Sequence, residues 1–144
     1  MSQPFTILLA EDEPADAGLV RAALNQGRIA CDFRHVIDGR EAMDFLRRDG
    51  RFGDAPRPDL VLLDLNMPRM DGREVLRAIK ADVELRAIPV VVLTTSDVER
   101  DVESSYLTGA AGYVTKPLDI EQFFAVIHGI EDYWFSIVRR AKAK

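Results

Sequence analysis

Five short runs of apolar residues recur along the chain and predict five β-strands. They cover residues 6–10, 31–37, 60–63, 89–93 and 112–114. Three of these runs are continuously apolar and do not alternate between apolar and polar residues. Strands of that kind are typical of a parallel sheet whose two faces are both covered by helices. The pattern therefore predicts a buried parallel sheet.

The segments that follow these runs have the three- and four-residue apolar spacing of amphipathic helices. The last of the five segments predicts an extended C-terminal helix over about residues 120–140. The apolar positions are Val20, Ala23 and Leu24; Ala42, Phe45 and Leu46; Val75, Leu76 and Ile79; Val98, Val102 and Tyr106; and Ile120, Phe123, Ile127, Trp134 and Val138. Strands and helices that alternate five times indicate a doubly wound α/β fold, with helices on both faces of the sheet.

The same tetrapeptide, Asp-Gly-Arg-Glu, opens two of the predicted helices, at residues 38–41 and 71–74. It places an acidic cap three residues before a glutamate, which is a pattern of helix starts. Nothing around the tetrapeptide repeats, so we interpret it as capping chemistry used twice. Residues 49–57 hold two glycines and a proline among charged residues, and we expect a long surface loop there.

The chain has 144 residues, about the length of one domain, so we expect a single domain over residues 1–144 with no effector domain. Its net charge of −5 disfavours nucleic-acid binding. One cysteine and two histidines, His35 and His128, supply neither a disulfide framework nor a zinc ligand set. The chain shows no signal peptide and no membrane-spanning run, and we expect a cytoplasmic protein.

Chemically reactive side chains follow four of the predicted strands. They are Glu11, Asp12 and Glu13 after the first, Asp64 after the third, Thr94 after the fourth and Lys116 after the fifth. The carboxyl ends of parallel strands meet at one edge of an open sheet, so these side chains should converge there. Carboxylates so placed repel one another unless one is protonated or a cation neutralises them. Their oxygen atoms suit a hard ion such as Mg²⁺.

This set of residues predicts phosphoryl transfer to a carboxylate. A cation held by Asp12 and Asp64 keeps coordination positions for phosphate oxygens, while Thr94 and Lys116 donate to the others. The carboxylate nucleophile would form an acyl phosphate. Taken singly, each residue has a plainer role: an acid such as Glu13 caps a helix, a lysine lies on the surface, and a threonine bonds to the backbone. Those roles leave unexplained why a carboxylate, Asp64, directly follows a continuous apolar run.

The chain resembles the receiver domain of two-component response regulators. Residues 64–72, Asp-Leu-Asn-Met-Pro-Arg-Met-Asp-Gly, resemble the family's phosphoacceptor loop, D-x-x-M-P-x-M-D-G. The other matching positions, in the family's order, are Glu11-Asp12, Thr94, Tyr113 and Lys116-Pro117. The resemblance spans about residues 6–130. It implies a flavodoxin-like fold with five helices and a five-stranded parallel sheet in the order 2-1-3-4-5.

The resemblance also implies what the acidic residues do. Asp64 would accept a phosphoryl group from a histidine kinase, which makes the protein a phosphorylation switch and not an enzyme. Asp12 and Asp64 would bind Mg²⁺ directly, Glu11 would act through water, and Asn66 would supply its backbone carbonyl. Glu11 stands where aspartate is also common in the family, and its extra methylene suits an outer-shell role.

Further positions gain roles from the same resemblance. Thr94 and Lys116 would contact the phosphoryl oxygens, and Thr94 and Tyr113 would form the switch. The turn at Lys116-Pro117 is expected to contain a cis peptide bond. Thr95 is larger than the family's usual residue, which narrows access to the phosphoacceptor and disfavours small-molecule phosphodonors.

The end of the chain resembles single-domain regulators paired with phytochrome-type histidine kinases. The apolar positions of the predicted last helix exceed one stripe, which indicates burial on more than one side. We expect a homodimer or a kinase interface, the dimer being built on the fourth helix, fifth strand and fifth helix. The expected interface residues are Phe124, Tyr133, Trp134 and Phe135. Packing of a long helix on its own domain is the alternative.

Three other functions fit parts of the sequence less well. A haloacid-dehalogenase-like phosphatase needs a second acid two residues after its nucleophile, where this chain has Asn66. A flavin-binding protein on this fold would not place acids in the first strand–helix loop. A degenerate receiver that acts as a scaffold would not need the complete set of Asp12, Asp64, Thr94 and Lys116.

Overall fold

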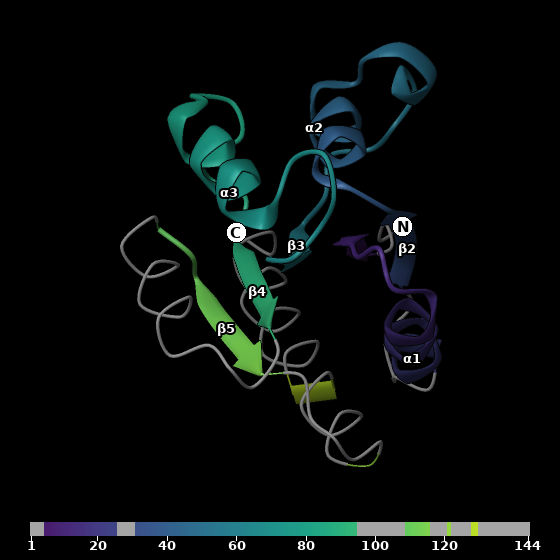
Figure 1. The fold of residues 1–144 in the computed structure, drawn as a ribbon. Helices are drawn as coiled ribbons and strands as arrows, with labels where there is room; N and C mark the ends of the chain where they lie inside the picture. The colour runs from purple at the N-terminus through teal and green to yellow at the C-terminus, as the bar shows by residue number, and fades with distance from the viewer. Residues whose placement is uncertain (1–4, 26–30, 95–108, 116–120, 122–127, 130–144) are drawn as a thin grey trace, which may run out of the picture.

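The structure, a computed structural model, describes residues 5–25, 31–94, 109–115, 121 and 128–129, with Thr94 and residues 112–115 described through their backbone. Five parallel strands form one sheet in the order β2-β1-β3-β4-β5. The strands are β1 (Phe5–Ala10), β2 (Cys31–Val36), β3 (Leu60–Asp64), β4 (Val90–Thr94) and β5 (Gly112–Thr115). The predicted doubly wound, flavodoxin-like α/β sheet and its strand order are therefore confirmed (Figure 1).

Helices cover both faces of this sheet, as the continuous apolar runs predict. The helix α1 (Pro14–Asn25) lies on one face, and α2 (Gly39–Arg47) and α3 (Gly72–Ala81) lie on the other (Figure 1). Successive residues of a strand point to opposite faces. In β1, Ile7 and Leu9 join the core under α1, whereas Leu8 and Ala10 join the core under α2 and α3. The central strands are apolar along most of their length because both of their faces are buried.

The register of the strands brings the functional residues to one edge. At the start of β3, Asp59 accepts a bond from the Thr6 amide at 2.9 Å and donates its own amide to the Thr6 carbonyl at 2.8 Å. This pair fixes β3 against β1, so that Ala10 lies opposite Leu63. Asp64 lies opposite Leu93, the residue before Thr94. The ends of β1, β3 and β4 therefore meet.

The two Asp-Gly-Arg-Glu segments cap helices as predicted. The Asp38 side chain accepts a bond from the Glu41 amide at 2.8 Å, and the Asp71 side chain accepts one from the Glu74 amide at 3.1 Å. Glycine is required at the second position of each segment for another reason, which the sequence pattern does not reveal. A Cβ atom on Gly39 would lie 1.9 Å from the Met70 carbonyl oxygen, and one on Gly72 would lie 2.3 Å from the Asp64 carbonyl oxygen. Only a residue without a side chain fits either place.

Residues 49–57, expected to form a surface loop, contain a helical turn and residues that pack on the core. The turn is a 3₁₀ turn, η1 (Gly50–Phe52), and the Phe52 ring packs on Phe45 of α2 with the ring centroids 5.4 Å apart. Ala55 is also buried in the core under α2 and α3. The residues around Phe52 are mostly charged or glycine, so the apolar pattern of the sequence does not indicate that Phe52 packs on the core.

The predicted fourth helix lies outside the described residues. Of the predicted last helix, Glu121, His128 and Gly129 are described and helical. The His128 ring forms a hydrogen bond with the Ala23 carbonyl of α1, which places His128 beside α1. No helix in the described parts of the chain is long and apolar enough to cross a membrane. The Lys116-Pro117 bond, predicted to be cis, also lies outside the described residues.

We predict that Gly39→Ala lowers the free energy of unfolding by ~1–3 kcal/mol, the usual cost of overpacking a filled site. The cause is the clash with the Met70 carbonyl, which is backbone and cannot rotate away. Urea denaturation measures the change. Gly18→Ala is the control: Gly18 is exposed in α1 with nothing within 4 Å of an added Cβ, so stability should rise by ~0.5–1 kcal/mol. Equal stability of wild type and Gly39→Ala would contradict the packing argument.

Candidate functional site

Three carboxylates converge at the carboxyl edge of the sheet. One ligand oxygen from each of Glu11, Asp12 and Asp64 lies within 4.8 Å of the others. Glu11 is 0% exposed and Asp64 is 4% exposed, whereas Asp12 is exposed. The cluster therefore has two acids inside the protein and one at its opening to solvent.

The β1–α1 connection positions Glu11 and Asp12. The Glu11 amide donates to the Val36 carbonyl of β2 at 3.0 Å, which extends the sheet pairing one residue beyond β1. The Glu11 carboxylate turns back and accepts a bond from the Glu13 amide at 3.2 Å. Glu13 caps the start of α1, as expected, with its carbonyl accepting from the Ala17 amide at 3.0 Å. Asp12 stands between these two anchored residues.

The loop after β3 positions Asp64. Asp64 is the last residue of β3, and its side chain accepts a bond from the Asn66 amide at 3.1 Å. Leu65 and Met67 are buried in the core under α2 and α3, while Asn66 between them is exposed. Alternate residues thus anchor the loop in the core, and the Asn66 backbone stays close to the Asp64 carboxylate.

The donor set fits a hard divalent cation. All the groups that converge here are oxygen ligands, which Mg²⁺ and Mn²⁺ accept readily. Two unit charges about 4 Å apart repel by about 1 kcal/mol in bulk water and by about 4 kcal/mol at an effective protein dielectric of 20. A cation between the three carboxylates removes that repulsion. Asp12 and Asp64 are the residues that would hold it, with the Asn66 carbonyl and, through water, Glu11.

The other predicted site residues lie partly within the described structure. The backbone of Thr94 ends β4 and pairs with Thr115, and Tyr113 of β5 pairs with Val92. Thr94 is therefore on the strand next to Asp64, and Tyr113 is one strand further out, both on the side of β3 away from Glu11. Lys116 lies outside the described residues, as do the expected interface residues Phe124, Tyr133, Trp134 and Phe135.

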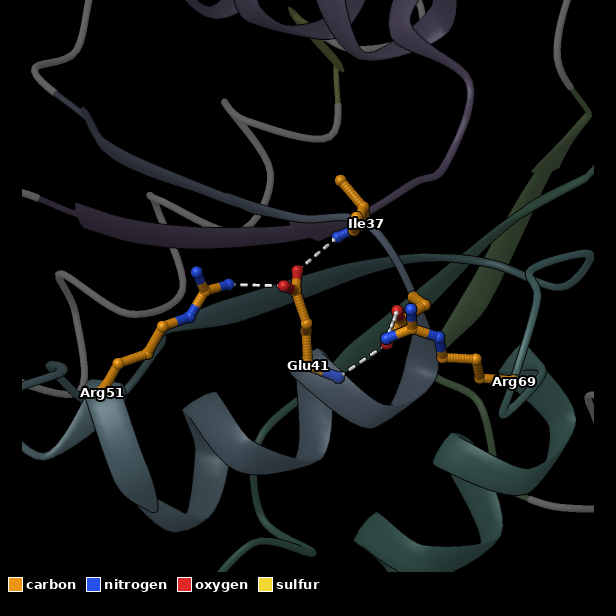
Figure 2. A network of polar contacts seen from close by, with 5 residues as sticks. Ile37, Glu41, Arg51 and Arg69 are labelled. Atoms are coloured by element: carbon orange, nitrogen blue, oxygen red, sulfur yellow. Dashed lines mark hydrogen bonds and ion pairs between the residues drawn. The ribbon is translucent and has the colours of Figure 1, made fainter.

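Sequence reasoning missed a contact that ties the loop after β3 to α2. Arg69 has a left-handed backbone conformation, with φ 66°, and its Nη1 atom lies 3.3 Å from Oδ2 of Asp38. The Asp38 side chain is 2% exposed and the Arg69 side chain 71% exposed. One buried carboxylate thus caps α2 with one oxygen and holds the loop with the other (Figure 2). The sequence shows the cap, but it gives no sign of the partner 31 residues away.

The first turn of α2 is held from its other side as well. The Glu41 carboxylate accepts a bond from the Ile37 amide at 3.0 Å and pairs with Arg51 of η1 (Figure 2). Because Glu41 binds Ile37, its carboxylate does not bond to the Asp38 amide as in a reciprocal capping box. The α2 start, the η1 turn and the loop after β3 are therefore one connected polar network.

Comparison with known proteins agrees with this site. Residues 7–128 match the response regulator receiver domain. The response regulator Rcp1 of Synechocystis sp. is 45% identical over 135 residues, which cover 94% of this chain and 92% of Rcp1. Glu11, Asp12 and Asp64 therefore lie inside the region that matches the receiver domain.

Two solved structures are similar over nearly the whole chain. The phosphorylated cyanobacterial phytochrome response regulator RcpA has a TM-score of 0.89 and 45% identity, and the match covers 94% of this chain and 96% of RcpA. The Mn²⁺-bound form of Rcp1 has a TM-score of 0.86 and 46% identity, and covers 91% of this chain and 94% of Rcp1. With this sheet order, this acidic cluster and these matches, the chain belongs to the response regulator receiver domain family.

Proposed function

We propose that the protein is a phosphorylation switch in which Asp64 accepts a phosphoryl group from a histidine kinase, with Mg²⁺ as cofactor. The observation that carries this proposal is the Asp64 carboxylate at the end of β3, within 4.8 Å of ligand oxygens of Glu11 and Asp12. A carboxylate in that place has a nucleophilic oxygen and a neighbouring cation site. A relative, RcpA, has been solved in a phosphorylated form.

The reaction follows from these groups. An Asp64 carboxylate oxygen attacks phosphorus, an O–P bond forms, and the N–P bond to the donor histidine breaks with its electron pair left on the imidazole. When bound, Mg²⁺ supplies positive charge next to the transferring phosphoryl oxygens. Asp12 is exposed, so it would bind the cation on the solvent side, from which the phosphoryl group enters. Glu11 is buried and would add its negative charge from the protein side of the cation.

Thr94 and Lys116 complete the site in this proposal. The Thr94 hydroxyl and the Lys116 ammonium donate to phosphoryl oxygens, and Tyr113 responds to the movement of Thr94. The support is the strand order, in which β4 lies next to β3 and β5 lies next to β4. A change at Thr94 reaches the β5 strand through the ladder that pairs Thr94 with Thr115.

Phosphorylation should be stoichiometric and confined to Asp64. Incubation with a phosphorylated histidine kinase and Mg²⁺ should add one phosphoryl group to the intact mass of the wild type. Asp64→Asn removes the nucleophilic oxygen and should leave the mass unchanged, as should excess chelator. A phosphorylated Asp64→Asn protein would contradict the assignment.

Mg²⁺ binding should depend on Asp12. Asp12→Asn should weaken Mg²⁺ affinity by at least about 10-fold in titration calorimetry, because even outer-shell partners of metal ligands are worth ~10–100-fold. Asp54→Asn removes the same charge from an exposed position in the connection before β3 and is the matched control. An equal loss of Mg²⁺ affinity in the two variants would show that Mg²⁺ affinity depends only on the net charge of the protein and not on Asp12.

The kinase partner is proposed to be of the phytochrome type. Its support is the similarity to RcpA, which is a phytochrome response regulator, over 94% of this chain. Phosphotransfer from a panel of histidine kinases tests it, with Asp64→Ala as the blank. Fastest transfer from a kinase without a phytochrome sensor would assign another partner.

Self-association is proposed through the face formed by the fourth helix, the fifth strand and the fifth helix. The proposal rests on the aromatic residues at 133–135, which lie outside the described residues. Trp134→Ser combined with Phe135→Glu should give a monomer that still accepts phosphate. Sedimentation over a concentration series measures this; a wild type that stays monomeric at micromolar concentrations, phosphorylated or not, contradicts the dimer.

Two alternatives make different predictions for the same assays. A phosphatase with an aspartyl nucleophile would turn over phosphate esters many times, whereas a switch, which is not an enzyme in this sense, takes one phosphoryl group. A scaffold receiver would bind its partner equally well as wild type and as Asp64→Ala and would not be phosphorylated.

A further inference from the structure

We propose that His35 is a positioning residue for the divalent cation site, acting through the backbone of Glu11. The proposal rests on the function proposed above and adds a residue to it. Nothing in the sequence pattern marks His35 for this task, since it lies inside the β2 strand, 24 residues from Glu11.

The contact is direct and its direction is fixed by chemistry. The His35 Nε2 atom lies 2.8 Å from the Glu11 carbonyl oxygen. A carbonyl oxygen only accepts hydrogen bonds, so Nε2 must carry the hydrogen atom. The bond is partly buried, and Glu11 is fully buried, so water competes for it little.

Both backbone polar groups of Glu11 therefore bind to β2. The Glu11 amide donates to the Val36 carbonyl at 3.0 Å, and the Glu11 carbonyl accepts from His35. The strand ladder itself ends at Ala10, opposite Val36. Beyond the end of the backbone ladder, the His35 side chain therefore supplies the hydrogen bond that joins the Glu11 carbonyl to β2.

The clamped carbonyl belongs to the peptide bond that leads into Asp12. Fixing its plane fixes the direction in which the chain leaves β1 and therefore the place from which the Asp12 side chain starts. On the other side, the Glu11 carboxylate is held by the Glu13 amide at 3.2 Å. Without the His35 bond, the peptide between Glu11 and Asp12 can rotate, and the two acids lose their common orientation toward Asp64.

A pair of substitutions separates the hydrogen bond from the volume of the ring. His35→Gln keeps an N–H donor at about the reach of Nε2, and His35→Met has a similar length without a donor. We expect His35→Met to weaken Mg²⁺ affinity by about 10-fold, the lower end of the range for partners of metal ligands. His35→Gln should remain within about threefold of the wild type, since it restores a neutral N–H donor.

A third variant controls for general weakening of β2. Phe33→Leu alters the residue two places before His35, whose side chain packs on the core under α1 and has no polar atom that could bind the Glu11 carbonyl. It should lower the melting temperature and leave Mg²⁺ affinity unchanged. All titrations are made on the full chain, below the melting temperature of every variant.

The wild type provides a test that needs no variant. Long-range ¹H–¹⁵N spectra should show His35 protonated at Nε2, and this nitrogen signal should shift when Mg²⁺ is added. An unprotonated Nε2, or a His35→Met protein that binds Mg²⁺ like the wild type, overturns the proposal, as do equal losses in the Met and Gln variants. A wild type that binds no Mg²⁺ overturns the proposed function itself, so the two failures are distinguishable.

Discussion

Mutual repulsion of three carboxylates is the constraint on which the rest of the structure depends. Glu11, Asp12 and Asp64 bring ligand oxygens within 4.8 Å of one another, and two of the three residues are buried. Carboxylates in that arrangement move apart unless the backbone that carries them is fixed in place. The parallel sheet fixes it, because its hydrogen bonds keep the ends of β1 and β3 side by side. A divalent cation then turns the repulsion into a binding site.

The connections around the cluster are held as firmly as the strands. Gly72 lies against the Asp64 carbonyl and Gly39 against the Met70 carbonyl, at distances that exclude any side chain. Asp38 links the first turn of α2 to Arg69. The loop after β3 therefore cannot shift without disturbing the start of α2. In the proposed function, a phosphoryl group on Asp64 changes other parts of the molecule only through contacts that differ between the two states. The packed connections next to Asp64 are the described contacts that such a change would reach first.

Much of this was predictable from the sequence, because the signals are local. Continuous apolar runs predict buried parallel strands, and an acid directly after such a run, as at Asp64, marks the edge of the sheet. The Asp38 and Asp71 caps also follow from spacing. The missed features join residues far apart in the chain: Asp38 with Arg69, His35 with Glu11, and Gly39 with Met70. No local pattern encodes such contacts, because they exist only once the sheet order has brought the segments together. Phe52 was missed for a related reason, since its charged neighbours mask its place in the core.

The central claim is that the acidic edge of the sheet holds a divalent cation next to Asp64, the proposed phosphoacceptor. Anomalous scattering from crystals grown with Mn²⁺ tests it most directly, because it locates the ion without any assumption about its ligands. The account predicts one strong peak within coordination distance of carboxylate oxygens of both Asp12 and Asp64 and of the Asn66 carbonyl. A peak elsewhere, or an ion bound to Asp12 that leaves Asp64 uncoordinated at saturating Mn²⁺, would contradict it.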